Sequence, residues 1–257
     1  MEITDKQFWE NYWGTISVPQ TVDYTFKNDR VIAETIKKHV PHATLGQRAA
    51  EIGCAPGKWL VFLNKELGFK LYGYEYLEPA AKKTKENLLA NDINELLFTI
   101  KVEDFVQNDL KEKFNVVLSL GFIEHFDNYQ EILKKHYLIT EKDGYIIIGI
   151  PNYRGITYLI QQFIDKFGDS DIIKNHNLNV MNLSTFETFG TTHGLQKIFL
   201  GYIGGFERGL FTTNSIHNPM IRVATKVTIR ILNLILGKFN HPYFSGYMLA
   251  IFKKESE

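Results

Sequence analysis

The chain has 257 residues and a formal net charge of zero, with 44% hydrophobic and 23% charged residues. This composition fits one α/β domain with added segments and argues against a disordered chain. The neutral balance also makes a nucleic-acid partner an unfavoured prediction, because such proteins usually carry a basic excess. A single cysteine, the lack of an apolar leader and the lack of a membrane-spanning run lead us to expect a cytoplasmic protein.

The first element expected along the chain lies in an N-terminal segment, residues 1–27. Trp9, Tyr12 and Trp13 recur there at helical spacing. We interpret the segment either as an aromatic lid over a ligand cleft or as an amphipathic helix that packs on the core. Residues 28–39 predict a second amphipathic helix.

Short apolar runs then alternate with helical patterns. The runs, which we predict as strands, are 48–53, 70–75, 97–102, 114–120 and 144–150, and the helical patterns are 57–67, 78–91 and 128–138. Such alternation is typical of a parallel sheet with helices on both faces. We therefore predict a doubly wound, Rossmann-like α/β core over residues 28–150.

The pattern changes after Pro151. Helices are predicted at 155–168, 184–192 and 219–237, a loop at 169–183, and strands at 195–203 and 244–252. We interpret residues 151–193 as a helical cap inserted over the ligand edge of the sheet. Residues 194–257 would then complete a single domain, in which a mostly parallel sheet of about seven strands ends in an antiparallel strand.

Small residues and acids follow three successive strands. Glu51 to Gly57 reads EIGCAPG, Glu75 ends the second strand, and Asp104 and Phe105 follow the third. Ligands of open α/β sheets bind at the carboxyl ends of the strands, where small residues permit close approach of the backbone. A carboxylate can accept hydrogen bonds from ribose hydroxyls or an adenine amino group. Each acid alone could be a solvated carboxylate, so the prediction depends on the set.

These blocks resemble the class I S-adenosylmethionine-dependent methyltransferases over roughly residues 45–152. The matching stretches are EIGCAPG, GYEYLEPA, VEDF, FNVVLSLGFIEHFDN and DGYIIIGIPN. The resemblance implies S-adenosylmethionine as the cofactor and S-adenosylhomocysteine as the product. It also implies a set of cofactor-binding residues: Glu51, Gly53, Cys54, Ala55 and Gly57 at the methionine end, Glu75 and Tyr76 at the ribose, Asp104 and Phe105 at adenine, and Leu120 and Gly121 beside the sulfonium.

Two other protein families are alternative interpretations of the glycine turn. The stretch GCAPGKW also resembles RNA ribose methyltransferases, but their fourth strand ends in Asp, whereas this one ends in Leu118-Ser119-Leu120. A nicotinamide dehydrogenase would require G-x-G-x-x-G, and the glycines here stand four apart without the third. We therefore favour the methyltransferase.

The catalytic candidates are two histidines. Methyl transfer to an alcohol benefits from a general base, and His125 after the fourth strand is the first candidate, with His176 in the predicted cap as the second. Both are equally explained as histidines that only pack or form hydrogen bonds, and Tyr153 is a third candidate. Some quinone-type methyltransferases bind a divalent metal through E-x-x-E-H. Gly121 replaces the first Glu here, so we expect no required metal.

The segment after Pro151 also resembles methyltransferases found with surface-polysaccharide and glycan assembly. This resemblance implies O-methylation of a small-molecule or glycan-type acceptor, to which Glu207 or Arg208 could bind. N-methylation, natural-product methylation and a cofactor-binding module without turnover remain alternatives. The oligomeric state is left open.

Residues 219–238 predict a basic amphipathic helix, because Arg222, Lys226 and Arg230 recur every four residues in an apolar stretch. The helix either packs on the sheet with a solvated basic stripe or contacts a membrane or a lipid-linked glycan. In the second case the protein would lie at the inner face of the membrane.

Overall fold

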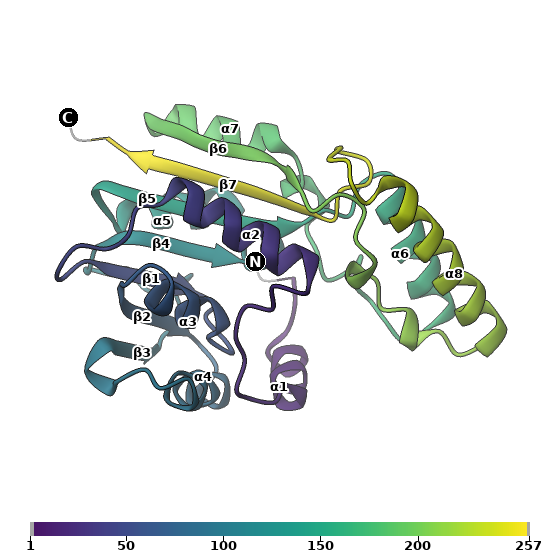
Figure 1. The fold of residues 1–257 in the computed structure, drawn as a ribbon, viewed down its shortest axis with the longest axis horizontal. Coiled ribbons are helices and arrows are strands. Elements are labelled where there is room, and N and C mark those ends of the chain that lie inside the picture. Colours follow the sequence, from purple (N-terminus) through teal and green to yellow (C-terminus); the bar gives the residue numbers. More distant parts are fainter. Residues whose placement is uncertain (1–2, 256–257) are drawn as a thin grey trace.

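A computed structural model describes residues 3–255 and contains a seven-stranded sheet of order β3-β2-β1-β4-β5-β7-β6 (Figure 1). The strands are β1 Arg48–Ile52, β2 Lys70–Glu75, β3 Phe98–Val102, β4 Phe114–Leu120, β5 Thr140–Pro151, β6 Leu195–Ile203 and β7 Tyr247–Lys254. β1 to β5 are parallel, and β7 runs antiparallel between β5 and β6. The predicted Rossmann-like sheet with an antiparallel final strand is confirmed.

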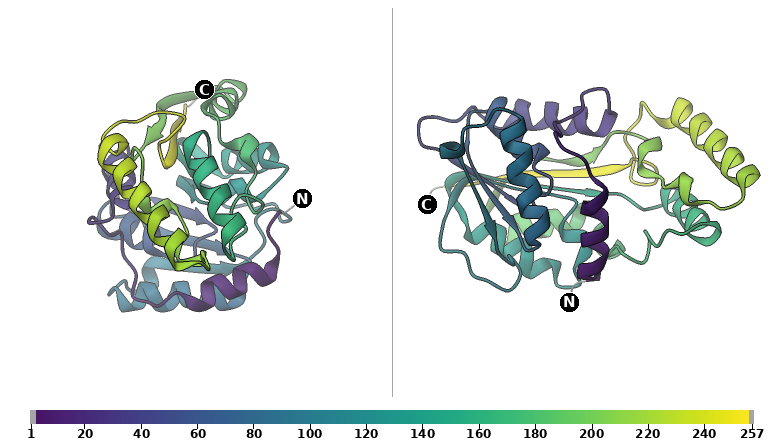
Figure 2. Two further views of the ribbon diagram at one scale, coloured as in Figure 1. Left: turned by 90° about the vertical axis from the view of Figure 1, so that its right-hand side faces the viewer. Right: turned by 90° about the horizontal axis from the view of Figure 1, so that it is seen from below.

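Helices cover both faces of this sheet (Figures 1 and 2). One face packs against α2 Lys27–His39, α3 Lys58–Lys65 and α4 Glu78–Ala90, and the other against α5 Tyr129–Leu138 and α7 Leu183–Thr192. Side chains of a strand point alternately to the two faces. Ala49 and Ile147 accordingly belong to one core and Ala50 and Ile148 to the other. Burial on both faces explains why the strands are nearly continuous apolar runs in the sequence.

Two helices lie beyond the carboxyl end of β5 and away from the sheet, where Figure 2 shows them side by side. These are α6 Ile156–Phe167 and α8 Pro219–Leu236. They enclose a small third core that includes Ile164 and Ile229. Among residues 3–255 no helix is both long and apolar enough to cross a membrane.

We expected residues 151–193 to form one inserted cap, but three parts of this range pack in different places. α6 packs with α8, residues 168–182 return toward the carboxyl edge of the strands, and α7 packs on β6. The N-terminal helix α1 Lys6–Thr15 contacts α4 at the same edge (Figure 1). The short 3-10 helices are η1 Glu95–Leu97, η2 Ile123–His125, η3 Leu178–Val180, η4 Arg208–Leu210 and η5 Thr213–Ser215.

Two strands, β5 and β7, differ from their predicted bounds by more than one residue. β5 begins at Thr140, four residues before the predicted start at Gly144, and β7 extends over 247–254 rather than 244–252. The start of β5, TEKD, is polar, so its hydrophobic pattern gives no strand signal. Backbone pairing of Phe114 with Thr140 places it in the sheet all the same.

Candidate active site

A cleft of about 730 Å³ lies at the carboxyl ends of the parallel strands, under α1. Gly53, Glu75 and Asp104, which follow or end three different strands, all line it, as the sequence predicts. Most of the other predicted site residues line it as well: Glu51, Ala55, Tyr76, Phe105, Leu120, Gly121, His125 and His176. Cys54 and Gly57 are absent from the lining.

Gly53 makes the sharp turn after β1 possible. Its φ is +67°, and a Cβ at this position would lie 2.7 Å from Cδ2 of Phe122, which follows β4. The backbone N–H of Gly53 donates to the carbonyl of Tyr74 on β2. A side chain would be strained and would clash with the wall of the cleft. The turn therefore brings bare backbone to the ligand edge.

Cys54 and Gly57 shape this turn from outside the cleft. The Cys54 side chain is fully buried, and its Sγ lies 2.7 Å from the position that a Cβ on Gly73 would take. Gly57 has a φ of +91° and is the N-cap of α3. Their role is to direct the backbone from β1 into α3.

Glu51 carries a buried carboxylate that the protein leaves partly unsatisfied. Oε2 has no hydrogen-bond partner among residues 3–255, and burial raises the pKa of the group well above its usual range. Leaving a buried oxygen unpaired is costly, so such an atom at a cleft indicates a missing partner. The ammonium of the methionine end of S-adenosylmethionine fits this requirement.

Glu75 and Asp104 are held in place by backbone N–H groups. Oε1 of Glu75 accepts from the N–H of Leu77 at 3.0 Å, and Oδ1 of Asp104 accepts from Val106 at 2.8 Å and Gln107 at 3.2 Å. These bonds fix two carboxylates at the tips of neighbouring strands. The spacing and chemistry suit ribose hydroxyls and an adenine amino group.

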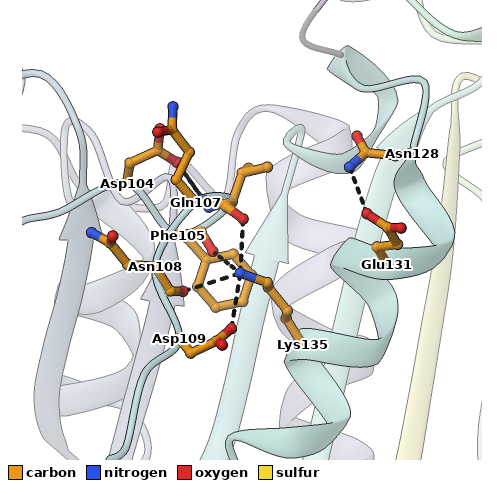
Figure 3. A network of polar contacts seen from close by, with 9 residues as sticks. Asp104, Phe105, Gln107, Asn108, Asp109, Asn128, Glu131 and Lys135 are labelled. Atoms are coloured by element: carbon orange, nitrogen blue, oxygen red, sulfur yellow. Dashed lines mark hydrogen bonds and ion pairs between the residues drawn. The ribbon is translucent and has the colours of Figure 1, made fainter.

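The loop after β3 is secured by a lysine that the sequence pattern does not reveal. Nζ of Lys135 on α5 donates to the carbonyls of Phe105, Val106 and Asn108 at 3.3, 2.7 and 3.1 Å, and lies 3.3 Å from Asp109 (Figure 3). One charge thus orders the segment that carries Asp104. Lys135 has no distinguishing motif, because only the packing of α5 beside this loop gives it the role.

The other end of the cleft contains a cluster of Glu124, His125 and His176. One ligand-type atom from each side chain lies within 4.8 Å of the others, and the two imidazole centroids are 4.7 Å apart. Glu124 and His125 are buried, with 1% and 6% of their surface exposed. The N-terminal and fourth-strand segments and the loop 168–182 meet here, since His125 Nδ1 is 3.0 Å from Oγ1 of Thr4 and 2.8 Å from the Asn175 carbonyl.

Both histidines are held through the same ring nitrogen. Nδ1 of His125 faces the Asn175 carbonyl, and Nδ1 of His176 lies 2.6 Å from the Ile172 carbonyl. A carbonyl only accepts, so each Nδ1 carries the hydrogen and each Nε2 has a lone pair. Burial lowers the pKa of His125 to about 3 and raises the pKa of Glu124 to about 8. At neutral pH both groups are therefore uncharged in the unliganded protein.

Aromatic side chains close this end of the cleft. Trp9, Tyr12 and Trp13 of α1 line it, and the ring of Trp9 lies edge-on to His125 at a centroid distance of 4.8 Å. Tyr153 also lines it, but its hydroxyl donates to the carbonyl of Leu210 at 3.2 Å. The helical spacing of these aromatic residues therefore reflects a helix, α1, that places them against the cleft.

Two residues predicted to bind the acceptor lie outside the cleft, and one residue that lines it was not predicted. Glu207 is buried and its side chain accepts from the N–H of Gly209, and neither it nor Arg208 lines the cleft. Tyr247, from the opposite end of the chain, does line it. Its position depends on the register of β7 against β5, where it pairs with Pro151. Nothing in the local sequence carries that signal.

The strand order, the glycine turn and the acids at the strand tips define a nucleotide-type cleft in a Rossmann-like methyltransferase fold. A family model described as "Methyltransferase domain" matches residues 24–198. The chain therefore belongs to the class I S-adenosylmethionine-dependent methyltransferases, as its resemblance to them implies.

Individual relatives agree with this family. The chain is 25% identical over 167 residues to a mitochondrial ubiquinone biosynthesis O-methyltransferase of Dictyostelium discoideum, a match that covers 59% of the chain and about half (51%) of that relative. A SAM-dependent methyltransferase from Archaeoglobus fulgidus superposes with a TM-score of 0.56 at 20% identity, over 97% of this chain and 100% of that one. Phosphoethanolamine N-methyltransferase 2 of Haemonchus contortus, in complex with S-adenosyl-L-methionine, gives 0.63 at 15% identity, over 88% and 53%.

Proposed function

We propose that this protein transfers the methyl group of S-adenosylmethionine to an oxygen atom of a small-molecule or glycan-type acceptor. The observation that carries this proposal is the buried cluster of Glu124, His125 and His176 beside Gly121, in the same cleft as the adenosyl-type residues. Its two Nε2 atoms are hydrogen-bond acceptors that suit a hydroxyl group. The name of the Dictyostelium relative, an O-methyltransferase, supports the same atom type.

The residues of the chain divide the work of this reaction. The cofactor supplies an activated methyl group with a neutral thioether as its leaving group, so the protein mainly has to align the reactants and exclude water. Glu51 would accept from the ammonium, and Glu75 from the ribose hydroxyls. The acceptor hydroxyl would lie at the histidine cluster, and the aromatic side chains of α1 would exclude water. The new O–C bond forms as the S–C bond breaks, sulfur keeps the electron pair, and the hydroxyl proton passes to solvent water.

The choice between His125 and His176 as proton acceptor depends on basicity. A general base works best when its pKa is near the working pH. Burial lowers the pKa of His125 to about 3, so this imidazole alone is a weak base. His176 is less deeply buried, and its pKa is lowered by the same cause. In our proposal the two imidazoles therefore position the acceptor, and additional activation of the hydroxyl is needed.

The proposed activity is tested in two stages. Calorimetry should first show that S-adenosylhomocysteine binds, and release of S-adenosylhomocysteine should then be measured with panels of hydroxyl and amine acceptors. We expect turnover with a hydroxyl acceptor, and His125→Ala should lower turnover while leaving cofactor affinity nearly unchanged. Turnover with amines alone would favour the N-methyltransferase alternative. Tight cofactor binding with no turnover in either panel would favour a binding module without activity.

We also propose that α8 contacts a membrane surface, which would give access to a lipid-linked acceptor. On α8 the apolar side chains Met220, Val223 and Leu234 are 80%, 60% and 77% exposed. The helix has no acidic residue, and Arg222 and Lys226 lie among the apolar positions. Exposed apolar groups with neighbouring cations favour an anionic lipid surface. A cytoplasmic location at the inner face of a membrane is part of this proposal.

Co-sedimentation with phosphatidylcholine vesicles, with and without phosphatidylglycerol, tests this contact. We expect binding that needs the anionic lipid and weakens with salt, and that is lost in a Met220→Gln, Leu234→Gln double variant. Leu45→Gln is the matched control, because Leu45 is fully exposed on a loop elsewhere. Concentration-dependent dimerisation without vesicle binding would instead assign the face to a second copy of the chain.

A further inference from the structure

We propose that Glu124, His125 and His176 form a binding site for a divalent transition-metal ion, and that the acceptor oxygen then binds to this ion in place of a hydrogen bond to the two Nε2 atoms. The metal site itself is independent of the reaction, and its role toward the acceptor rests on the proposed O-methyl transfer. The sequence predicts no metal, because Gly121 replaces the first Glu of E-x-x-E-H. The tertiary structure instead supplies His176, from the loop 168–182, as a third donor.

The three donor atoms are near the separation that a bound cation requires. They lie within 4.8 Å of one another, and Nε2 of His125 is 4.0 Å from Oε1 of Glu124. Ligands of tetrahedral Zn²⁺ are about 3.3 Å apart, given bond lengths of roughly 2.1 Å. Rotation of the three side chains can supply the remaining approach. No backbone segment has to move into the cluster, because all three residues already line the cleft.

The hydrogen bonds behind the histidines are those expected of metal ligands. A metal-bound imidazole usually donates its other N–H to a carbonyl or a carboxylate, which fixes its tautomer and orientation. Asn175 and Ile172 provide such carbonyls for the Nδ1 atoms of His125 and His176. Each Nε2 thereby keeps its lone pair, and that of His125 lies 4.0 Å from Oε1 of Glu124.

Glu124 provides a second, independent observation. Its Oε2 is buried and has no hydrogen-bond partner among residues 3–255. A carboxylate oxygen in this position has lost its water without gaining a donor, which is unfavourable unless a ligand completes it. A cation that displaces the proton of the Glu124 carboxyl satisfies this oxygen and both imidazole lone pairs together. An anion would leave both imidazole lone pairs unsatisfied, because it offers no hydrogen-bond donor.

The ligand types indicate which ion fits. Two imidazoles and one carboxylate suit Zn²⁺, Mn²⁺ or Fe²⁺, whereas Mg²⁺ and Ca²⁺ prefer oxygen ligands. Three protein ligands leave coordination positions open toward the cleft, as in catalytic rather than structural sites. A cation there would lower the pKa of an acceptor hydroxyl, so that its proton could leave to solvent before methyl transfer.

The test is a titration of the full chain, freed of metal by a chelator, with Zn²⁺ by calorimetry and with Co²⁺ by visible absorption. We expect one ion per chain, a Co²⁺ spectrum of low coordination number, and no comparable binding of Mg²⁺. His176→Gln and Glu124→Gln should each weaken Zn²⁺ binding by at least about tenfold. His42→Ala, which removes an exposed histidine outside the site, should leave it unchanged.

Binding of S-adenosylhomocysteine reports on folding in every variant, and His176→Ala provides a second substitution if His176→Gln does not fold. The proposal is overturned if the wild-type chain binds neither Zn²⁺ nor Co²⁺. It is equally overturned if folded His176 variants bind as tightly as the wild type. If metal binds but no hydroxyl acceptor is methylated, the metal site stands and the proposed O-methyl transfer fails. If the chain methylates a hydroxyl acceptor but binds no metal, the proposed O-methyl transfer stands and the metal site fails.

Discussion

At the adenosyl end of the cleft the polar groups come from the tips of adjacent parallel strands, whereas at the acceptor end they come from segments far apart in the chain. Glu75 and Asp104 are each fixed by backbone N–H groups two or three residues away. His125 and His176 are fixed by carbonyls of the loop 168–182. The first end is therefore a property of the strands and their turns. The second depends on a loop and on α1, which can change without disturbing the sheet.

The carboxyl groups of the cleft also differ in how completely their oxygens are satisfied. Glu75 and Asp104 accept backbone hydrogen bonds before any ligand arrives, whereas Oε2 of Glu51 at the methionine end and Oε2 of Glu124 at the acceptor end accept none among the described residues. A carboxylate that already accepts such bonds has a fixed orientation. A buried oxygen without a donor destabilises the unliganded protein until a ligand supplies one. Glu51 and Glu124 should therefore respond more strongly to ligand binding than Glu75 and Asp104.

The largest expected effect concerns His136, a buried histidine of α5 behind the adenine end of the cleft. Nε2 of this fully buried histidine is 3.0 Å from Oγ of Ser119 on β4, and its ring packs on Phe105. Burial lowers its pKa to about 4, below the value of about 6.5 in the unfolded chain. Its contribution to stability is complete above pH 6.5 and is lost as pH falls toward 4, because the unfolded state then binds the proton more readily.

Denaturant unfolding between pH 7.5 and pH 4 measures this contribution as the difference between wild type and His136→Gln. We expect the wild type to lose about 3 kcal/mol more of its unfolding free energy than the variant over this interval. Parallel pH curves for the two proteins would show that His136 does not titrate with a lowered pKa. The comparison cancels the other histidines, which both proteins share.

Glu75→Ala should separate the two ends of the cleft. Loss of charge-assisted hydrogen bonds to the ribose should weaken S-adenosylhomocysteine binding by about 100-fold in calorimetry. Zn²⁺ affinity should stay as in the wild type, whereas His176→Gln should show the opposite pattern. Glu78→Ala is the matched control, since this exposed acid begins α4 three residues later. A change below threefold in the Glu75 variant would contradict its assignment to the ribose.

Lys135→Met should weaken cofactor binding without removing any group from the cleft. The variant keeps most of the side-chain volume but loses the donors that hold the carbonyls after β3. We expect about tenfold weaker S-adenosylhomocysteine binding and faster amide hydrogen exchange in residues 104–109. Unchanged exchange in this loop would mean that Lys135 does not order it. Lys134→Met tests for a general effect of charge removal on α5.

The smallest effect is expected for α1, which covers both ends. Trp9→Ala removes one edge-on aromatic contact with His125 and opens the cleft, so S-adenosylhomocysteine should dissociate about fivefold faster in stopped-flow measurements. Stability should change by less than about 0.5 kcal/mol, because no residue of α1 is fully buried. Trp9→Phe should restore slow dissociation. If dissociation is unaffected in Trp9→Ala, α1 does not act as a lid.

Local sequence was sufficient for the sheet and for the adenosyl end of the site. The apolar runs of β2 and β4 predict these strands within their observed bounds, because burial on both faces leaves a simple hydrophobic signal. Gly53, Glu75 and Asp104 could be placed in one cleft from the sequence alone. Parallel strands bring their carboxyl ends to a common edge, so residues at successive strand tips become neighbours by topology.

Tertiary structure alone decided the acceptor end. His176 meets Glu124 and His125 because the loop 168–182 folds back onto the strand edge, and Tyr247 arrives through the register of β7 against β5. Neither placement leaves a periodic pattern, since a loop has no repeat and a pairing register is a relation between two distant segments. The sequence by itself therefore determined the fold and the family of S-adenosylmethionine-dependent methyltransferases to which the chain belongs. The tertiary packing determined which side chains surround the acceptor end of the cleft.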